Sequence, residues 1–210
     1  MIVVAGPPGS GKSSRFPLAS FGIVQLNADD RAAELNGRSY IGISPEIRAV
    51  VNQEFEQFVH AHIQSGQSFA IETTLRSGVT FDQARMARSH GFQTLMLFVA
   101  LNRVDLNLER VANRADAGGH SAPASMLRSF HERSTANLAL SLSPTSGLQL
   151  VIVYDNSAFG DASPSELLRV FDGRPTYLTE TPPAWLEQAL RNSPYDLRGL
   201  RLIIDQASDP

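Results

Sequence analysis

The chain opens with a short apolar stretch that runs into a glycine-rich motif and then into a helix-like segment. Met1–Ala5 is rich in β-branched residues, and the residues after it read GPPGSGKSS. They satisfy the pattern G-x-x-x-x-G-K-[ST], in which glycines let backbone N–H groups converge on phosphate oxygens without a Cβ in the way. The pattern therefore predicts a nucleoside triphosphate site on a loop between a strand and a helix.

Two side chains of this motif carry the expected chemistry. Lys12 is predicted to reach the β- and γ-phosphates, and the hydroxyl of Ser13 to complete the ligand shell of a Mg²⁺ ion. Lys12 is also the single lysine among 18 Lys and Arg residues. We therefore expect ATP and Mg²⁺ as cofactors, held by Gly6, Pro7, Pro8, Gly9, Ser10, Gly11, Lys12, Ser13 and Ser14.

Strand-like and helix-like segments alternate along the chain, which predicts an α/β fold with a doubly wound, mainly parallel five-stranded sheet. With the phosphate motif after its first strand, this order resembles the P-loop kinase type of fold. The expected strands are Met1–Ala5, Ile23–Leu26, Phe69–Ile71, Thr94–Ala100 and Leu150–Tyr154. We expect a kinase-type domain over residues 1–160 with a helical lid around 103–135. Residues 161–210 are rich in proline and are expected to form a helical extension packed on the same domain.

Composition excludes several classes of protein. The 210 residues contain no cysteine, which removes disulfides, thiol nucleophiles and cysteine zinc sites. The longest apolar run, Leu95–Leu101, is too short to span a bilayer, and no signal peptide precedes the first strand, so we expect a cytoplasmic protein without a membrane partner. A net charge of −3 argues against nucleic acid as a partner.

Carboxylates follow two of the predicted strands, at the edge of the sheet where ligands of such folds collect. Asp29 is the candidate that orients an acceptor hydroxyl and takes its proton. The equal alternative is that Asp29 or Asp30 caps a helix that begins at Arg31. Glu72 directly follows an apolar strand, as a Walker-B carboxylate does, and is either a ligand of substrate or Mg²⁺ or a strand-end residue that caps the next segment.

Two arginines lie one turn apart on the predicted helix Val104–Ala117, so that Arg110 and Arg114 share a face. Neither arginine has an acidic neighbour three or four residues away on the helix. This favours pairing of the two guanidinium groups with an anion from outside the helix, such as a triphosphate. The alternative is a solvated basic patch. We expect both arginines to act in catalysis.

Two further positions are candidates by their place in the chain. His120 follows a Gly-Gly pair and either donates to a phosphate of the substrate or caps a helix end. Asn156 follows the last predicted strand. The loop there either contacts the adenine base of the nucleotide or forms an ordinary turn.

These motifs together resemble the zeta toxin family of P-loop kinases, in its stand-alone chromosomal form. The similarity extends from Met1 to about Ser157 and rests on GPPGSGKSS, Asn27-Ala28-Asp29-Asp30, Phe69–Thr74, Arg110-Val111-x-x-Arg114, Gly118-Gly119-His120-x-x-Pro123, Asn137-Leu138 and Tyr154–Ser157.

The resemblance implies transfer of the γ-phosphate of ATP to the 3′-hydroxyl of the amino sugar in UDP-N-acetylglucosamine. It implies that Asp29 is the catalytic base, that Lys12 is the P-loop lysine, and that Glu72 and Thr74 bind the sugar nucleotide. Arg76 and His120 are our further candidates for binding the substrate. The resemblance also implies a lid arginine at Arg110 or Arg114 and admits a protein antitoxin as partner. In plasmid-type members a second lid arginine lies shortly before a proline, where this chain has His120.

Other functions fit parts of the pattern. Asn27-x-Asp29-Asp30-Arg31 after a glycine-rich loop also resembles polynucleotide 5′-kinases, and the same scaffold serves kinases of small metabolites. A nucleotide-dependent regulatory module without significant turnover is the alternative from another class. Strand-end carboxylates beside a basic lid favour a kinase, because a switch needs no base for an acceptor hydroxyl.

Overall fold

A computed structural model describes residues 1–116, 123–158, 162–191, 193 and 195–208, with the backbone alone for 114–116 and 205–208. The strands are β1 (Ile2–Ala5), β2 (Val24–Leu26), β3 (Phe69–Thr73), β4 (Leu95–Ala100), β5 (Leu150–Asp155), β6 (Ser165–Phe171) and β7 (Arg174–Leu178). The helices are α1 (Lys12–Arg15), η1 (Leu18–Phe21), α2 (Ala28–Leu35), α3 (Pro45–Ser65), α4 (Val79–Ser89), α5 (Val104–Asp116), α6 (Ala124–Ser141), η2 (Pro144–Ser146), α7 (Ala184–Leu190) and α8 (Leu197–Ser208), of which η1 and η2 are 3₁₀ turns.

The strands form one sheet in the order β2-β3-β1-β4-β5-β6-β7, and the first five in sequence pair in parallel. The predicted α/β class and the five predicted strands are confirmed. β1 lies centrally between β3 and β4, so the chain moves to one side of it and then to the other. The loop after β1 therefore lies at the switch point of the topology, where ligands bind in folds of this kind.

The sheet has seven strands and not five, because β6 and β7 add an antiparallel hairpin at one edge. The expectation of a purely helical extension over 161–210 was wrong in this respect. Asp172 and Gly173 form the two-residue turn, with φ of 45° and 74°, as a type I′ turn requires. Pro175 lies in β7, an edge strand, where a missing backbone N–H is tolerated.

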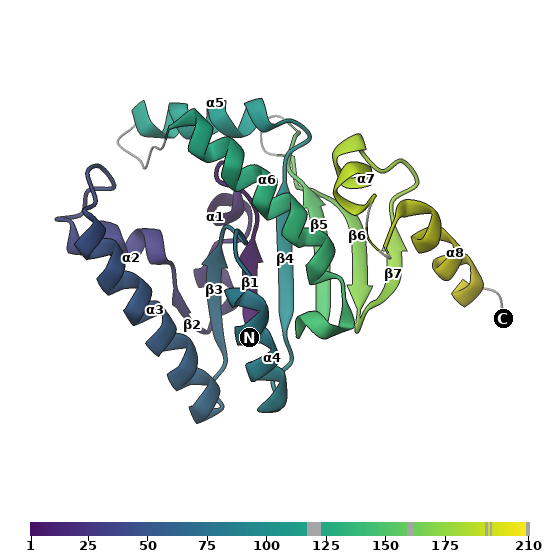
Figure 1. Cartoon of the computed structure of the whole chain (residues 1–210), viewed down its shortest axis with the longest axis horizontal. Helices are drawn as coiled ribbons and strands as arrows, with labels where there is room; N and C mark the ends of the chain where they lie inside the picture. Colours follow the sequence, from purple (N-terminus) through teal and green to yellow (C-terminus); the bar gives the residue numbers. More distant parts are fainter. Residues whose placement is uncertain (117–122, 159–161, 192, 194, 209–210) are drawn as a thin grey trace.

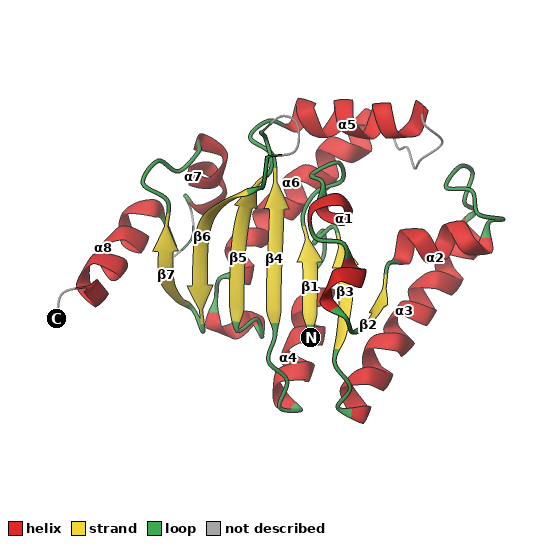
Figure 2. Ribbon diagram, turned by 180° about the vertical axis from the view of Figure 1, so that it is seen from behind, coloured by secondary structure: helices red, strands yellow, loops and turns green. Residues whose placement is uncertain are grey.

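The longer helices lie mostly on one face of the sheet. α3, α4 and α6 cover that face, while α5 crosses above the ends of the strands (Figure 1). Seen from behind, α1 lies against the opposite face near β1 and β3 (Figure 2). A small cluster of Val4, Leu18 and Ala70 forms the core on that side. The main core lies on the helix-covered side, among side chains such as Phe69, Phe98 and Leu138.

The predicted helix Val104–Ala117 is present as α5, whereas the helix expected to begin at Arg31 begins at Ala28. α1 is a single turn, so the cradle for phosphate is formed by the loop more than by a long helix. α7 and α8 are the helical part of the extension, and they pack against α6 and β7 respectively. Within the described residues, no helix combines the length and apolarity that crossing a membrane requires.

The turn between β6 and β7 gives a test of the hairpin. A Cβ at Gly173 would lie 2.7 Å from Cδ of Pro144, in addition to the strain of a φ of +74°. We expect Gly173→Ala to lower the free energy of unfolding by about 2–4 kcal/mol in urea titrations.

The matched control is Gly37→Ala, at a φ of +66° with nothing within 4 Å of the new Cβ. It keeps the backbone strain alone, about 1 kcal/mol. Equal losses in the two variants would contradict the tight contact between the hairpin and Pro144.

Candidate active site

Three glycines let the loop after β1 lie against its surroundings. Gly6, Gly9 and Gly11 have φ of 139°, 76° and 89°, values that L side chains rarely adopt. A Cβ at Gly6 would lie 2.1 Å from the carbonyl oxygen of Val99, and a Cβ at Gly9 would lie 2.5 Å from that of Asn107. A Cβ at Gly11 would lie 2.3 Å from Nδ2 of Asn156. The motif is therefore seated on β4, α5 and the end of β5 at once.

The lysine of the loop is hydrogen-bonded to the backbone of the loop. The ammonium of Lys12 donates to the carbonyl oxygens of Gly6 at 2.9 Å and Pro7 at 3.1 Å. Lys12 is only 6% exposed, and a buried ammonium needs such acceptors. Ser13 and Ser14 follow on the exposed side of α1.

Glu72 links the loop to the neighbouring strand. It is paired in register with Val4 of β1, and its side chain is 14% exposed. Its Oε2 accepts a hydrogen bond from the Ser13 hydroxyl at 2.8 Å, and its Oε1 lies 3.9 Å from Nζ of Lys12. The structure thus brings the predicted strand-end carboxylate to the two side chains of the motif that are expected to meet phosphate and metal.

Asp29 lies in the first turn of α2 and does not cap that helix. The cap of α2 is Asn27, whose Oδ1 accepts from the backbone N–H groups of Asp29 at 2.9 Å and Asp30 at 3.4 Å. The capping alternative was wrong because Asn27 has extended backbone angles and already fills that role. Instead, Oδ1 of Asp29 accepts from Arg48 of α3 at 2.8 Å, while Asp30 accepts from the hydroxyl of Tyr40 at 2.8 Å.

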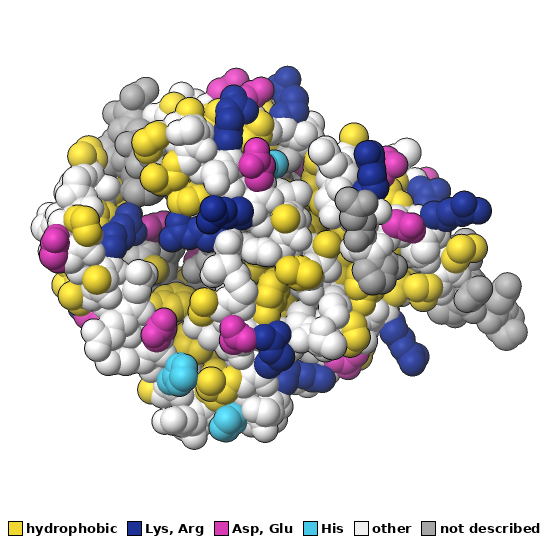
Figure 3. Space-filling model, viewed as in Figure 1, with side chains coloured by type: hydrophobic (Ala, Val, Ile, Leu, Met, Phe, Trp, Pro, Cys, Tyr) yellow, Lys and Arg dark blue, Asp and Glu magenta, His cyan; other side chains and the backbone are white. Residues whose placement is uncertain are grey.

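The place of Asp29 follows from the sheet. β2 lies two strands from β1, and adjacent strands lie about 4.8 Å apart, so the ends of β1 and β2 are about 10 Å from each other. Figure 3 shows the surface hollowed between α5 and the α2–α3 pair, with basic side chains at the rim. Asp29 and the phosphate loop therefore follow parallel strands at the same edge of the sheet.

The turn after β3 carries Thr74 and Arg76. It is fixed by Leu75, a buried residue with a φ of 52°, whose carbonyl oxygen accepts from Nδ2 of Asn137 on α6 at 2.8 Å. The guanidinium of Arg76 lies 4.5 Å above the centre of the Phe130 ring. Arg76 thus packs on α6, and Thr74 lies directly after the strand that carries Glu72.

Helix α5, part of the segment expected to form a lid, lies along the phosphate loop. Nδ2 of Asn107 donates to the carbonyl oxygen of Pro8 at 2.8 Å, and Nη2 of Arg110 donates to the carbonyl oxygen of Asn156 at 3.1 Å. Arg110 is thereby held beside the loop. Arg114 belongs to α5, but its side chain is outside the described part, and His120 lies outside the described residues.

Asn156 is buried against the loop, where its amide contacts Ser10 and Arg15. Sequence reasoning placed this residue near the nucleotide but did not predict those contacts. It also missed Asn107 and Arg48, for which the sequence gives no local signal. Asn27 could have been found, because an asparagine directly before two aspartates is typical of a helix start.

A family model described as an AAA domain matches residues 1–136. The chain belongs to this family. The matched stretch contains the glycine-rich loop, both strand-end carboxylates, α5 and most of α6. A P-loop nucleotide-binding domain is therefore shown for the larger part of the chain.

Solved structures share the fold over almost the whole chain. One comes from the PezAT chromosomal toxin–antitoxin system of Streptococcus pneumoniae, with a TM-score of 0.61, 15% identity, and coverage of 100% of this chain and 86% of that one. Another is AvrRxo1-ORF1:AvrRxo1-ORF2 with sulphate ions, with a TM-score of 0.62, 15% identity, and coverage of 98% and 75%. The predicted resemblance to the zeta toxin family is thereby confirmed at the level of the fold, which is that of a P-loop kinase.

A curated relative is an uncharacterized protein of Haemophilus influenzae (strain ATCC 51907 / DSM 11121 / KW20 / Rd). It is 27% identical over 121 residues, which cover 57% of this chain and 83% of the relative. At 15% identity the solved structures show the fold of this chain, which belongs to the AAA domain family.

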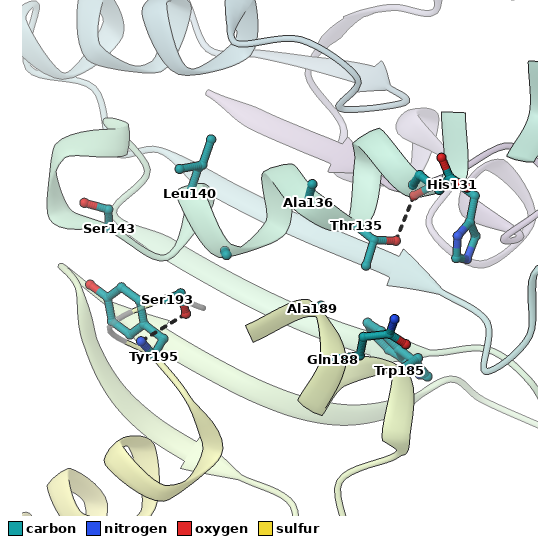
Figure 4. A pocket seen from close by; sticks show the side chains of 12 residues that line it. His131, Thr135, Ala136, Leu140, Ser143, Trp185, Gln188, Ala189, Ser193 and Tyr195 are labelled. Atoms are coloured by element: carbon teal, nitrogen blue, oxygen red, sulfur yellow. Dashed lines mark hydrogen bonds between the residues drawn. The ribbon is translucent and has the colours of Figure 1, made fainter. Parts of the chain in front are cut away.

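A second concavity of about 700 Å³ lies between α6 and α7, away from the loop. Figure 4 shows His131, Thr135 and Leu140 of α6 on one side and Trp185 and Gln188 of α7 on the other. Burial lowers the pKa of His131 below its ordinary 6.5, and the nearby Glu132 opposes this only in part. The surroundings therefore favour the neutral form of the imidazole over the charged one.

This burial predicts a pH dependence of stability. Between the folded-state pKa of His131 and about 6.5, the unfolded chain binds more protons than the folded one, so the free energy of unfolding falls as the pH falls through that window. In urea titrations, the free energy of unfolding should differ less between pH 7.5 and pH 5.5 for His131→Gln than for the wild type. His60→Gln, at an exposed position of α3, is the matched control and should keep the wild-type difference. An unchanged difference in His131→Gln would contradict this account.

Proposed function

We propose that the protein is an ATP-dependent kinase that transfers the γ-phosphate to a hydroxyl of a sugar nucleotide, with UDP-N-acetylglucosamine as the acceptor that the zeta-type resemblance favours. One observation carries the proposal. Asp29 is held by Arg48 at the edge of the sheet that bears the phosphate loop, and it is not used as a helix cap. A pure nucleotide switch has no need of such a carboxylate.

The loop supplies the binding of the triphosphate. Glycines at positions 6, 9 and 11 leave the backbone N–H groups free of side-chain shielding. When the nucleotide binds, Lys12 is proposed to give up its hydrogen bonds to the carbonyl oxygens of Gly6 and Pro7 and to bind the oxygens of the β- and γ-phosphates. Arg110 lies beside the same loop, and with Arg114 it is proposed to stabilise the charge that spreads over the transferred group.

The residues present fit a Mg²⁺ ion that is shared with the nucleotide. Ser13 and Glu72 offer a hydroxyl and a carboxylate oxygen 2.8 Å apart, and Mg²⁺ is usually bound by one or two such groups together with phosphates and water. Within the described residues, no cluster of three His, Asp or Glu side chains forms a separate metal cage. When bound, the ion would neutralise charge on the β- and γ-phosphates.

The proposed reaction is an in-line transfer. The acceptor oxygen forms a bond with the γ-phosphorus, the bond between that phosphorus and the bridging oxygen of ADP breaks, and the hydroxyl proton goes to Asp29. Arg48 occupies one carboxylate oxygen of Asp29, which fixes the orientation of the group. Glu72, Thr74, Arg76 and His120 are proposed to bind the acceptor.

One partner assignment follows from the comparison. The structural neighbours are a toxin–antitoxin system and an ORF1:ORF2 pair, so we propose a protein antitoxin as a partner. The cytoplasmic location expected from the sequence stays part of the proposal. A polynucleotide acceptor is less well supported. Arg31, the arginine of the motif shared with polynucleotide kinases, is bound to Glu54 at 2.7 Å and 3.2 Å and to Glu34 at 2.9 Å, which leaves it poorly placed for a phosphate backbone.

The test is ADP formation with ATP and Mg²⁺ across an acceptor panel of UDP-sugars, single-stranded oligonucleotides and nucleosides. We expect ADP formation to depend on a UDP-sugar. Asp29→Asn should lower kcat by about 100-fold or more, because it removes the group that positions and accepts the proton.

Asp30→Asn is the matched control. It makes the same change one residue along, at a carboxylate held by Tyr40, and should leave kcat within a factor of about two. Oligonucleotide-dependent ADP formation, or an equal effect of the two substitutions, would contradict the proposal.

A further inference from the structure

Asn156 stands at a junction of the elements that surround the phosphate loop. It directly follows β5 and is 3% exposed. Its backbone N–H donates to the carbonyl oxygen of Ala100, at the end of β4, at 2.9 Å. The residue is thus fixed to two parallel strands before its side chain makes any contact.

Both polar atoms of the Asn156 side chain form hydrogen bonds, one with the loop and one with α1. Nδ2 donates to the carbonyl oxygen of Ser10 at 2.9 Å, and Oδ1 accepts from Nε of Arg15 at 3.2 Å. Nδ2 would lie 2.3 Å from a Cβ at Gly11, so the amide occupies the space that the glycine leaves.

This contact sets the direction of a peptide group in the loop. In a planar trans peptide, the C=O and the N–H point in opposite directions. The Ser10 carbonyl points at Asn156, and the Gly11 N–H of the same unit is therefore turned away from Asn156. Donors of the loop can bind an anion only if their peptide units keep such an orientation.

The backbone of Asn156 holds the lid as well. Its carbonyl oxygen accepts from Nη2 of Arg110 on α5 at 3.1 Å. One residue therefore fixes both the loop and an arginine that is proposed to meet the γ-phosphate.

The C-terminal part of the chain supports this junction from the other side. Asp155 accepts from the indole N–H of Trp185 on α7 at 3.0 Å through Oδ2, and from the backbone N–H of Ser157 at 2.7 Å through Oδ1. Figure 4 shows Trp185 at the α7 side of the concavity next to α6. α7 thereby helps to hold the segment that carries Asn156.

We propose that Asn156 is a positioning residue for the polyphosphate and does not read the base of the nucleotide. It holds the Ser10–Gly11 peptide and Arg110 in the arrangement that binds phosphates, and α7 supports it through Trp185 and Asp155. The inference deepens the proposed function, on which its catalytic consequence rests.

The test compares ligands with and without a base. Asn156→Asp replaces the donor that faces the Ser10 carbonyl by a charged oxygen, with almost no change in size. We expect calorimetric affinities for ATP, GTP and inorganic tripolyphosphate, each with Mg²⁺, to fall by the same factor, about 10- to 100-fold. Asn52→Asp makes the same change at an exposed position of α3 and should leave all three affinities unchanged.

Trp185→Phe is the second variant, since it removes the indole donor far from the loop and keeps an aromatic ring. It should weaken the three ligands by a smaller common factor, and it keeps the test decisive if Asn156→Asp does not fold. A loss for ATP that spares tripolyphosphate would overturn the proposal and make Asn156 a base-reading residue. Unchanged affinities in both variants would also overturn it. Wild-type protein that binds tripolyphosphate but forms no ADP with any acceptor would overturn the proposed function alone.

Discussion

The close seating of the glycine-rich loop is the constraint on which the rest of the site depends. Side chains at Gly6, Gly9 or Gly11 would overlap with a strand carbonyl, a helix carbonyl or a buried amide, all within 2.5 Å. The loop touches β4, α5 and the residue after β5 at these points, so its shape depends on the positions of these elements. These contacts join the loop directly to α5 and to the residue after β5.

The charges around the loop are balanced before any ligand binds. Lys12 is buried on two carbonyl oxygens and lies near Glu72, which also accepts from Ser13. A buried ammonium and a buried carboxylate are costly when they are alone and tolerable together. A nucleotide with Mg²⁺ would bring negative charge to Lys12 and positive charge to Glu72, so binding can replace one balanced arrangement by another. This is a physical reason for a carboxylate at the end of the strand beside the loop.

The five parallel strands and the loop could be predicted from the sequence, because buried parallel strands are continuously apolar and the phosphate motif has a fixed spacing. The hairpin of β6 and β7 was missed although Asp172-Gly173 between alternating residues is a hairpin signal. The nearby prolines led to the prediction of a helical extension instead. The contacts of Asn156 and Arg48 could not have been predicted, since each joins segments far apart in sequence and depends on how the helices pack.

The most direct measurement is a crystal structure of the protein with Mg²⁺ and a non-hydrolysable ATP analogue. The account predicts that Nζ of Lys12 leaves the Gly6 and Pro7 carbonyls for the phosphates and that the Ser13 hydroxyl and the Glu72 carboxylate face the metal. It also predicts that the Asp29 carboxylate faces the γ-phosphate across the space for an acceptor. A triphosphate bound elsewhere, or an Asp29 directed away from the γ-phosphate, would contradict it.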